Sequence, residues 1–147
     1  GITDPRNLGA IARTAECMGA VGIVVPRHGS APVTGVVCKA SAGAVEHLRI
    51  AEVRNLADWL VEARRHGTWA FAADGDDGAP PASLDLGGAI VLVLGAEGTG
   101  VRPRVRAACD GGVRIPMAGA IGSLNVAVAA GMLLYEAARQ RAARPLG

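Results

Sequence analysis

The sequence predicts an α/β fold with a mainly parallel sheet flanked by helices, and two observations support this prediction. Helical and extended hydrophobic patterns alternate along the 147 residues, as they do in α/β proteins. The run AIVLVLG at 89–95 is apolar throughout, which is typical of a strand covered on both faces of a parallel sheet. We see no internal repeat and no linker, so residues 1–147 are expected to form one domain.

The first half of the chain is expected to contain three helices and three strands. Five apolar residues recur at helical spacing near the start of the chain, namely Leu8, Ile11, Ala12, Ala15 and Met18. Gly19 would end that helix, Asn55 can cap a later one, and Gly67 would stop it. The expected elements are helices at about 7–18, within 33–46 and at 56–66, and strands at 21–25, 49–53 and 68–73.

The second half of the chain ends in its longest expected helix. The expected elements are a polar surface loop at 74–88, a strand at 89–95, a short helix near 102–109, a strand at 113–115 and a helix at 123–141. The last helix has hardly any polar side chain before Glu136, so most of its sides must be covered. In a small chain we expect a second subunit to cover the apolar surface of this helix, which comprises Val126, Val128, Met132 and Leu133.

Composition excludes few classes of function. Fourteen Arg and one Lys give a net charge of only +2, which is too small to indicate nucleic-acid binding by itself. A GC-rich genome and phosphate recognition would both favour Arg. No apolar run reaches the roughly 18–20 residues that cross a bilayer, and no secretory leader is visible. The chain begins at Gly1 rather than Met, so we expect further residues upstream.

The cysteines and histidines give no sign of a metal site. Three cysteines without a C-x-x-C pair, Cys17, Cys38 and Cys109, are expected to be buried reduced thiols of a cytoplasmic protein. The three histidines, His28, His47 and His66, are expected at the surface. No metal is predicted.

The first motif whose side chains could take part in chemistry is N-x-G-x-x-x-R, which comprises Asn7, Gly9 and Arg13. As ordinary structure, Asn7 would cap the helix and Arg13 would pair with Glu16. As a functional site, Gly9 would leave room for a ligand and Arg13 would reach across that space. The motif alone does not decide between the two.

The second motif, VLVLGAEGTGVRPRV, places a glycine-rich turn directly after a buried strand. Such a turn lets backbone N–H groups approach a ligand closely. Gly95, Gly98 and Gly100 run G-x-x-G-x-G, which is not the order of the dinucleotide fingerprint, and no phosphate-loop Lys follows. Glu97 would repel phosphate and suits a ligand with amino or hydroxyl donors. A tight turn with a solvated Glu97 is the structural alternative.

The third motif, IPMAGAIGSLN, precedes the last helix, which Ser123 or Asn125 could cap. With this motif the chain resembles the SpoU (TrmH-type) RNA ribose 2′-O-methyltransferases of the SPOUT superfamily over almost its whole length. The segments KASAGAVEHLRIAEVRNLADWL and IPMAGAIGSLNVAVAAGMLLYEAARQR resemble the RlmB-like branch, which methylates a guanosine of bacterial 23S rRNA, more than the tRNA branch.

The resemblance implies a methyl transfer from S-adenosylmethionine to a ribose 2′-hydroxyl, a C-terminal trefoil knot and a homodimer. The residues implied in catalysis are Asn7, Arg13, Glu97, Ser123 and Asn125. Those implied or expected at the cofactor are Leu94, Gly95, Gly98, Ile115, Pro116, Met117, Leu124 and Asn125. Those expected to meet RNA are Arg6, Arg13, Arg102, Arg104 and Arg106.

In the family Arg13 is the proposed activator of the 2′-hydroxyl. A guanidinium stays protonated in proteins, so its physical role is to hold the target phosphate and stabilise the developing alkoxide. The resemblance also implies a strand just before the first motif and an N-terminal RNA-binding domain, and the sequence contains neither. The alternatives are a tRNA ribose methyltransferase, a cofactor- or RNA-binding module without activity, and a nicotinamide-dependent reductase, which would need the other glycine order.

Overall fold

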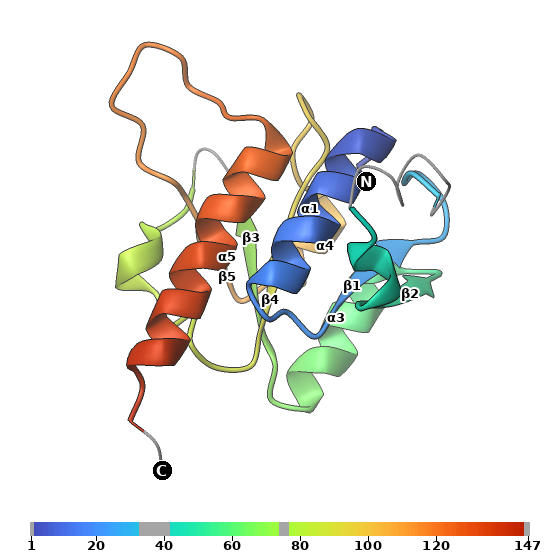
Figure 1. The fold of residues 1–147 in the computed structure, drawn as a ribbon, viewed down its shortest axis with the longest axis horizontal. Coiled ribbons are helices and arrows are strands. Elements are labelled where there is room, and N and C mark those ends of the chain that lie inside the picture. The colour runs from blue at the N-terminus through green and yellow to red at the C-terminus, as the bar shows by residue number, and fades with distance from the viewer. Residues whose placement is uncertain (1, 33–41, 74–76, 146–147) are drawn as a thin grey trace.

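The computed structural model describes residues 2–32, 42–73 and 77–145, and their strands form two parallel sheets (Figure 1). In the first sheet β1 (Gly22–Pro26) pairs with β2 (Arg49–Val53). In the second, β3 (Trp69–Ala73) lies between β4 (Ile90–Val93) and β5 (Gly111–Val113). Every one of these pairings is parallel, so the predicted sheet type is confirmed.

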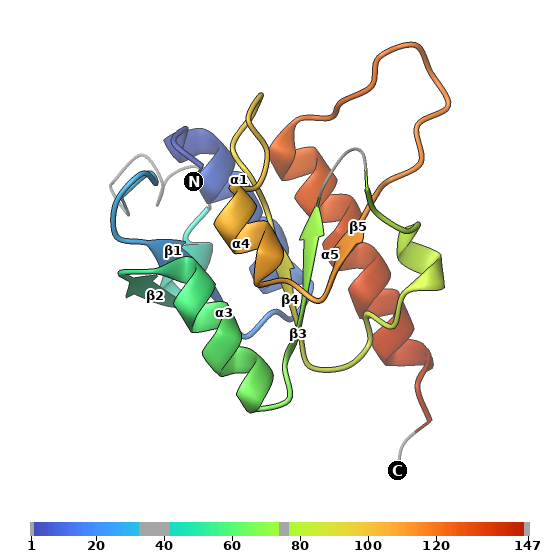
Figure 2. The ribbon, with the colours of Figure 1, turned by 180° about the vertical axis from the view of Figure 1, so that it is seen from behind.

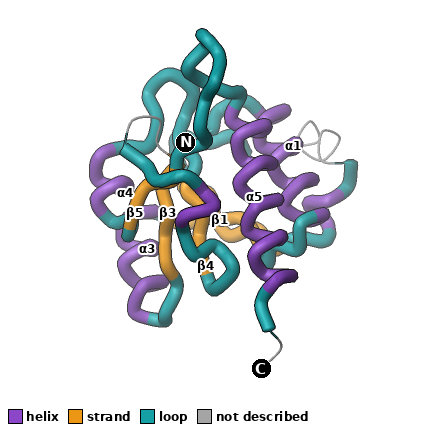
Figure 3. The backbone as a smooth tube through the Cα atoms, turned by 90° about the vertical axis from the view of Figure 1, so that its left-hand side faces the viewer, coloured by secondary structure: helices purple, strands orange, loops and turns teal. Residues whose placement is uncertain are grey.

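Helices cover the strands from both sides, which gives three layers. Helices α1 (Pro5–Cys17) and α5 (Val126–Ala143) pack against each other on one side. Helices α3 (Leu56–Arg65) and α4 (Pro103–Ala107) lie on the other (Figures 2 and 3). Two short 3-10 helices, Ala44–Glu46 and Pro81–Ser83, complete the regular structure of the described residues.

Local signals explain where the helices begin and end. The Asp4 carboxylate accepts a hydrogen bond from the N–H of Arg6 at 2.8 Å, and Pro5 occupies the first turn of α1. Asn55 caps α3 by accepting from Asp58 N at 3.0 Å, and Gly67 follows α3 with a φ of +84°. The two ends of α3 match the predicted helix. Helix α1 begins earlier than predicted, and its cap is Asp4 rather than Asn7.

The core lies on both sides of the strands and is built of small aliphatic residues. Between the second sheet and α3 it contains Leu60, Ala70, Ala72, Val93 and Cys109. On the side of α1 and α5, smaller clusters contain Leu8, Ile11, Ala12, Ala15, Val25 and Ala130 among others.

The C-terminal half of α5 is fastened to the chain before β4. Gln140 Oε1 accepts from Leu86 N at 2.8 Å, and Gln140 Nε2 donates to Pro81 O at 3.2 Å. Leu86 is fully buried. The same Gln140 Nε2 also donates to Glu136. This hydrogen bond and those from Arg139 lower the pKa of the Glu136 carboxyl to about 2.

Several expectations need correction. Strand β5 is Gly111–Val113 rather than 113–115, and α5 begins at Val126 rather than at Ser123. Of the helix expected within 33–46, residues 33–41 lie outside the described residues, and 44–46 form a 3-10 turn. Strand β4 is not covered on both faces, because Val93 alone among its residues is buried.

The predicted surface of α5 is also corrected. Val126 and Leu133 are buried inside the chain, whereas Val128 and Met132 are exposed, as predicted. Tyr135, which was not predicted there, is exposed as well. No helix in the described part of the chain is long and apolar enough to cross a membrane.

Candidate active site

Hydrogen bonds join three side chains that are far apart in the sequence. Asn7 Nδ2 donates to Glu97 Oε1 at 3.1 Å. Asn125 Nδ2 donates to Asn7 Oδ1 at 3.1 Å and also lies 3.4 Å from Glu97 Oε1. We call these three residues the Asn7–Glu97–Asn125 network. One residue comes from each of the three predicted motifs, so the structure brings the motifs together.

The orientation of the Asn125 amide is set by helix α5. Its Oδ1 accepts from the N–H groups of Ala127 at 2.9 Å and Val128 at 3.2 Å, so Asn125 is the N-cap of α5. With the oxygen engaged at the helix, the Nδ2 group is left to face Asn7 and Glu97. Of the two candidate caps, Asn125 is the one that the structure shows.

Glu97 lies at the tip of a turn between β4 and α4. Ala96 and Gly100 form an antiparallel bridge across this turn, and Gly100 N donates to Ala96 O at 2.9 Å. Gly98 and Gly100 have φ values of +83° and +69°, a region that favours glycine. The turn therefore holds Glu97 at its outer end.

Gly95 is needed by the turn itself. A Cβ on Gly95 would overlap the backbone of Gly100 and Val101. The turn's own backbone therefore fills the space beside Gly95, so Gly95 can offer a ligand only its backbone groups. Cβ atoms on Gly98 and Gly100 would meet nothing within 4 Å, so the open surface lies beside these two glycines.

The segment between β5 and α5 has no regular structure and carries the third motif. Ile115 and Met117 are partly buried, and Pro116 is exposed. Leu124 is 37% exposed and Ile121 is 79% exposed, so large apolar side chains face solvent here. Ile121 was not singled out from the sequence. An exposed isoleucine between glycines is the signal that could have identified it.

Some predicted residues do not join the network. Ser123 is exposed and makes no hydrogen bond with a described residue. Arg13 is exposed too, and among the described residues it has no ion-pair partner, so the alternative pairing with Glu16 is not observed. Gly9 is buried, which contradicts the open space expected beside it.

The other predicted arginines line different parts of the surface. Arg6 is exposed on the first turn of α1. Arg102 lies against Gly29, where a Cβ would be 3.1 Å from its Nη2 atom. Arg104 pairs with Asp58 of α3 at 3.6 Å, and both side chains are largely exposed. Arg106 is partly buried and also makes an interaction within the chain.

The described residues contain no cluster of His, Cys, Asp and Glu that could hold a metal ion. His28, His47 and His66 are exposed, as predicted. Cys109 is buried, and this burial raises the pKa of its thiol. Cys17 is exposed on the last turn of α1, which contradicts its expected burial, and Cys38 lies outside the described residues.

The exposed surface around the network fits a ligand that is partly apolar and partly polar. Leu124, next to Asn125 in the sequence, offers apolar contact, and the position beside Gly98, next to Glu97, is open to the approach of a ligand. Glu97 Oε1 accepts two of the three hydrogen bonds of the network, and no described residue donates to Oε2. An adenosine with hydroxyl and amino donors has this chemistry.

Comparison with known proteins gives consistent relatives. Residues 1–135 match the model of the SpoU rRNA Methylase family. The chain is 44% identical to the 23S rRNA (guanosine-2′-O-)-methyltransferase RlmB of Pseudomonas syringae over 98% of its own length. It is 46% identical to RlmB of Xanthomonas campestris over 96% of its length. The chain spans 58% and 57% of these relatives.

Solved structures agree with this result. The SpoU methyltransferase AviRb of Streptomyces viridochromogenes in complex with AdoMet has a TM-score of 0.87 and 36% identity, over 97% of this chain and 58% of that one. The A. aeolicus TrmH/SpoU tRNA modifying enzyme has a TM-score of 0.87 and 30% identity, over 97% of this chain and 72% of that one. Motifs, fold and relatives lead to one conclusion: the chain belongs to the SpoU rRNA methylase family.

Proposed function

We propose that this chain is the catalytic domain of an enzyme that transfers a methyl group from S-adenosylmethionine to a ribose 2′-hydroxyl of RNA, a guanosine of 23S rRNA. The observation that carries the proposal is the Asn7–Glu97–Asn125 network, because it joins the three motifs through side chains. The curated relatives named above are 23S rRNA methyltransferases, which supports the choice of substrate. Such an enzyme would work in the cytoplasm.

The cofactor would be held by the two segments that follow β4 and β5. Backbone groups of Gly95 and Gly98 in the first segment, and of Ile115 in the second, would face it. Leu124 would supply apolar contact, with Leu94, Pro116 and Met117 around it. When bound, S-adenosylmethionine supplies a methyl group on a positively charged sulfur, which is already electrophilic. The structure of AviRb in complex with AdoMet supports this cofactor for the family.

The chain's own residues would align the acceptor and stabilise charge. Arg13 keeps its proton and has no described partner, so its guanidinium is available to a phosphate of the RNA. The same charge would stabilise the alkoxide that develops as the 2′-hydroxyl attacks. Glu97 Oε2 would accept a hydrogen bond from a hydroxyl or amino group, and Asn7 and Asn125 would hold Glu97 in place. Alignment of the reacting atoms would then supply much of the rate.

Recognition of RNA would rest largely on residues outside this chain. The net charge is +2, and Arg104 is already engaged with Asp58. Each phosphate contact steepens the decrease of log affinity with log salt concentration by about 0.7–0.9. A surface with few basic residues makes few such contacts and therefore binds RNA weakly. We propose that an upstream RNA-binding domain selects the target while Arg6, Arg13 and Arg102 meet the phosphates near the site.

We also propose a homodimer that forms through α5 and α1. Val128, Met132 and Tyr135 lie about one turn apart on α5 and are 51%, 49% and 63% exposed. Three large apolar side chains in one row are unusual for a surface that stays in water. The trefoil knot of the C-terminal half stays a prediction.

The main test is a methyl-transfer assay with labelled S-adenosylmethionine on unmodified 23S rRNA and tRNA transcripts, followed by mapping of the modified nucleotide. It should be run on residues 1–147 and on a longer version that includes the upstream region. We expect methylation of one guanosine of 23S rRNA, at a much lower rate for residues 1–147. Methylation of tRNA alone would replace the proposed substrate. No methyl transfer, together with no heat of binding for S-adenosylhomocysteine, would refute the proposal.

Arg13→Ala is expected to lower the rate about a hundredfold, or about 3 kcal/mol, with cofactor affinity nearly unchanged. The matched control is Arg65→Ala, at an exposed arginine on α3 that pairs with Glu62, and this variant should leave the rate unchanged.

For the dimer, Met132→Asp should give monomers in sedimentation, whereas Val61→Asp, at an exposed valine of α3, should not. Monomers before any substitution would contradict the dimer.

A further inference from the structure

Two arginines occupy equivalent positions at the ends of neighbouring strands. Arg27 directly follows β1, and Arg54 directly follows β2. The two strands are in register up to Pro26 and Val53, and Arg27 N donates to Val53 O at 2.8 Å. The next position on each strand is therefore an arginine, and both arginines are exposed. We call these two residues the Arg27–Arg54 pair.

No carboxylate of the described residues neutralises this pair. Like charges at neighbouring positions of adjacent strands repel each other. Neither guanidinium forms an ion pair with a described residue, although Glu52 lies close to Arg54 in the sequence. Asp58, in the helix that follows Arg54, is paired with Arg104 instead, at 3.6 Å. The pair therefore lowers the stability of the free chain, and an anion shared by both arginines would remove that repulsion.

A third arginine reaches the same place from the turn that carries Glu97. Arg102 is the N-cap residue of α4, and it is exposed. Its Nη2 atom lies 3.1 Å from the position that a Cβ on Gly29 would occupy. Gly29 has a φ of +79° and belongs to the loop that begins at Arg27. The guanidinium of Arg102 thus lies against the backbone of this loop.

Helices α3 and α4 bring Arg54 and Arg102 towards each other. Arg104, near the start of α4, pairs with Asp58 in the first turn of α3. Arg54 directly precedes the N-cap residue of α3, and Arg102 is the N-cap of α4. Both arginines therefore lie where these two helices begin. The Arg27–Arg54 pair and Arg102 thus come from three separate loops, which follow β1, β2 and β4.

This end of the strands is also the end at which the Asn7–Glu97–Asn125 network lies. Leu8, the neighbour of the network asparagine in α1, packs with Val25 and Ala31, which lie on either side of the loop after β1. Arg102 follows the turn that holds the network carboxylate. The three arginines therefore lie beside the site that is proposed for the target ribose, on the side of β1 and β2.

We propose that Arg27, Arg54 and Arg102 bind the phosphate backbone of the RNA beside the target ribose. This inference rests on the proposed function, which brings that ribose to the network. A guanidinium donates two parallel hydrogen bonds to phosphate oxygens, and a phosphate between two arginines replaces their repulsion with attraction. All three side chains are exposed, which suits a polyanion that lies across the surface better than an enclosed phosphate ion. Backbone contacts position RNA without reading its sequence, so these arginines contribute affinity and not the choice of guanosine.

The salt dependence of RNA binding tests the proposal. A 23S rRNA transcript is titrated at several salt concentrations against the longer version of the protein that the methyl-transfer assay uses. Arg27→Gln combined with Arg54→Gln should reduce the slope of log affinity against log salt concentration by about 1.5, because two phosphate contacts are lost. At low salt this double variant should bind roughly tenfold more weakly.

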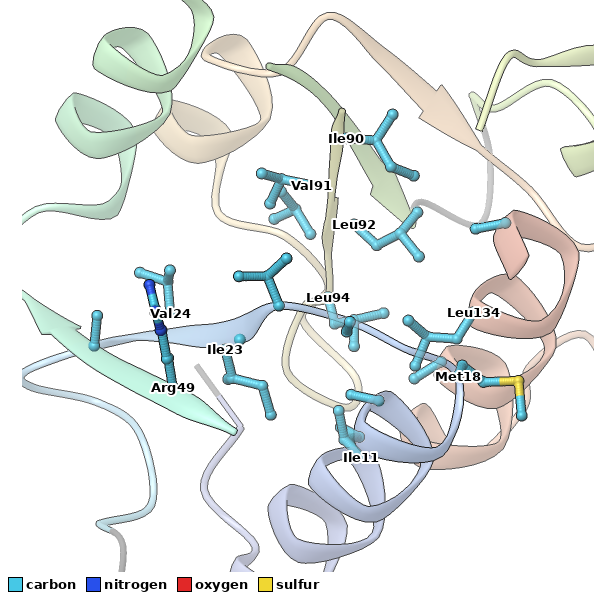
Figure 4. A pocket seen from close by; sticks show the side chains of 18 of the residues that line it. Ile11, Met18, Ile23, Val24, Arg49, Ile90, Val91, Leu92, Leu94 and Leu134 are labelled. Carbon is cyan, nitrogen blue, oxygen red and sulfur yellow. The ribbon is translucent and has the colours of Figure 1, made fainter. Parts of the chain in front are cut away.

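The matched control removes the same charge from the opposite ends of the same elements. Arg49 begins β2, where it lines an apolar groove of about 610 Å³ between β1 and β4 (Figure 4), and Arg65 ends α3. Arg49→Gln combined with Arg65→Gln should leave the slope nearly unchanged. An equal reduction by both double variants would show an effect of net charge alone and would overturn the proposal.

Kinetics and stability separate this proposal from the proposed function. The double variant at Arg27 and Arg54 should raise KM for RNA and leave kcat and the affinity for S-adenosylhomocysteine nearly unchanged. Its urea midpoint should not fall, because a repulsive pair has been removed. Methyl transfer with an unchanged KM and an unchanged salt slope would overturn this proposal while the proposed function stands. Absence of methyl transfer by the unchanged protein would refute the proposed function, and the salt slope would still decide whether these arginines bind RNA.

Discussion

Replacing Asn125 by aspartate separates the two tasks of this side chain. Aspartate caps helices about as well as asparagine, so the N–H groups of Ala127 and Val128 keep their acceptor. The Nδ2 donor becomes an oxygen that can no longer donate to Asn7 Oδ1. It also lies where Asn125 Nδ2 now is, 3.4 Å from Glu97 Oε1. The variant thus keeps the cap and turns an attraction within the network into a repulsion.

The size of the effect follows from this geometry. Two unit charges about 3.4 Å apart repel by about 1.2 kcal/mol in water and by about 5 kcal/mol at an effective dielectric constant of about 20. Both side chains are exposed, so the lower figure applies, and the lost hydrogen bond to Asn7 adds about 1 kcal/mol. We therefore expect Asn125→Asp to lower the free energy of unfolding by about 2 kcal/mol. That is about 1 M in the urea midpoint for a slope of about 2 kcal/mol/M.

Urea unfolding of a double-mutant cycle checks this reasoning. In the Glu97→Gln background the repulsion is absent, so Asn125→Asp should cost about 1 kcal/mol less than in the unchanged protein. High salt should narrow that difference, because it screens exposed charges. The control is Asn125→Ala, which loses the cap and should show no such salt dependence. An equal cost of Asn125→Asp in both backgrounds would refute the contact between Asn125 and Glu97.

Three further predictions concern packing and reactivity. Gly95→Val should disrupt the turn after β4 and abolish binding of S-adenosylhomocysteine in calorimetry. Binding retained by this variant would show that the turn can open. Gln140→Ala should lower the free energy of unfolding by about 1–3 kcal/mol, because it leaves the buried N–H of Leu86 without an acceptor; an unchanged urea midpoint would contradict it. Iodoacetamide at pH 8 should label Cys17 much faster than Cys109, since burial raises the pKa of the Cys109 thiol and so leaves less thiolate, which peptide mass spectrometry can measure. Equal rates would mean that Cys109 is accessible.

Elements with strong local signals were predicted well. The strand at 49–53 is β2 to the residue, and the helix between Asn55 and Gly67 is α3. Strand β5 was displaced because Gly111 and Gly112 carry no side-chain pattern. Their strand conformation depends on pairing with β3, which is distant in the sequence. Local periodicity cannot report such a pairing.

The open edge of β4 could not be predicted for a similar reason. Its run of apolar residues indicates a strand covered on both faces, and in the structure these residues line a groove. The pattern reports what the strand is suited to contact. It does not report which contacts the strand makes in the folded chain.

The candidate site was predicted only in part. Asn7, Glu97 and Asn125 were identified from their motifs, and their contact spans 90 and 118 residues of sequence. Of the two candidate caps of α5, the structure shows Asn125 and not Ser123, whereas the catalytic part assigned to Ser123 stays a prediction. The space beside Gly95 is taken by the backbone of the same turn. A glycine motif identifies a crowded backbone but not which group crowds it.

The network also explains how one carboxylate fits a site that is proposed to meet phosphate. Asn7 lies in the first turn of α1 and Asn125 caps α5, so the N-terminal ends of both helices converge on Glu97. Each helix end carries roughly half a positive charge, and together they offset the negative charge of Glu97. The exposed Arg13, further along α1, then adds a full positive charge on the same helix. In the proposed reaction, the site would therefore offer Glu97 as an acceptor for a hydroxyl while it still attracts the phosphate beside that hydroxyl.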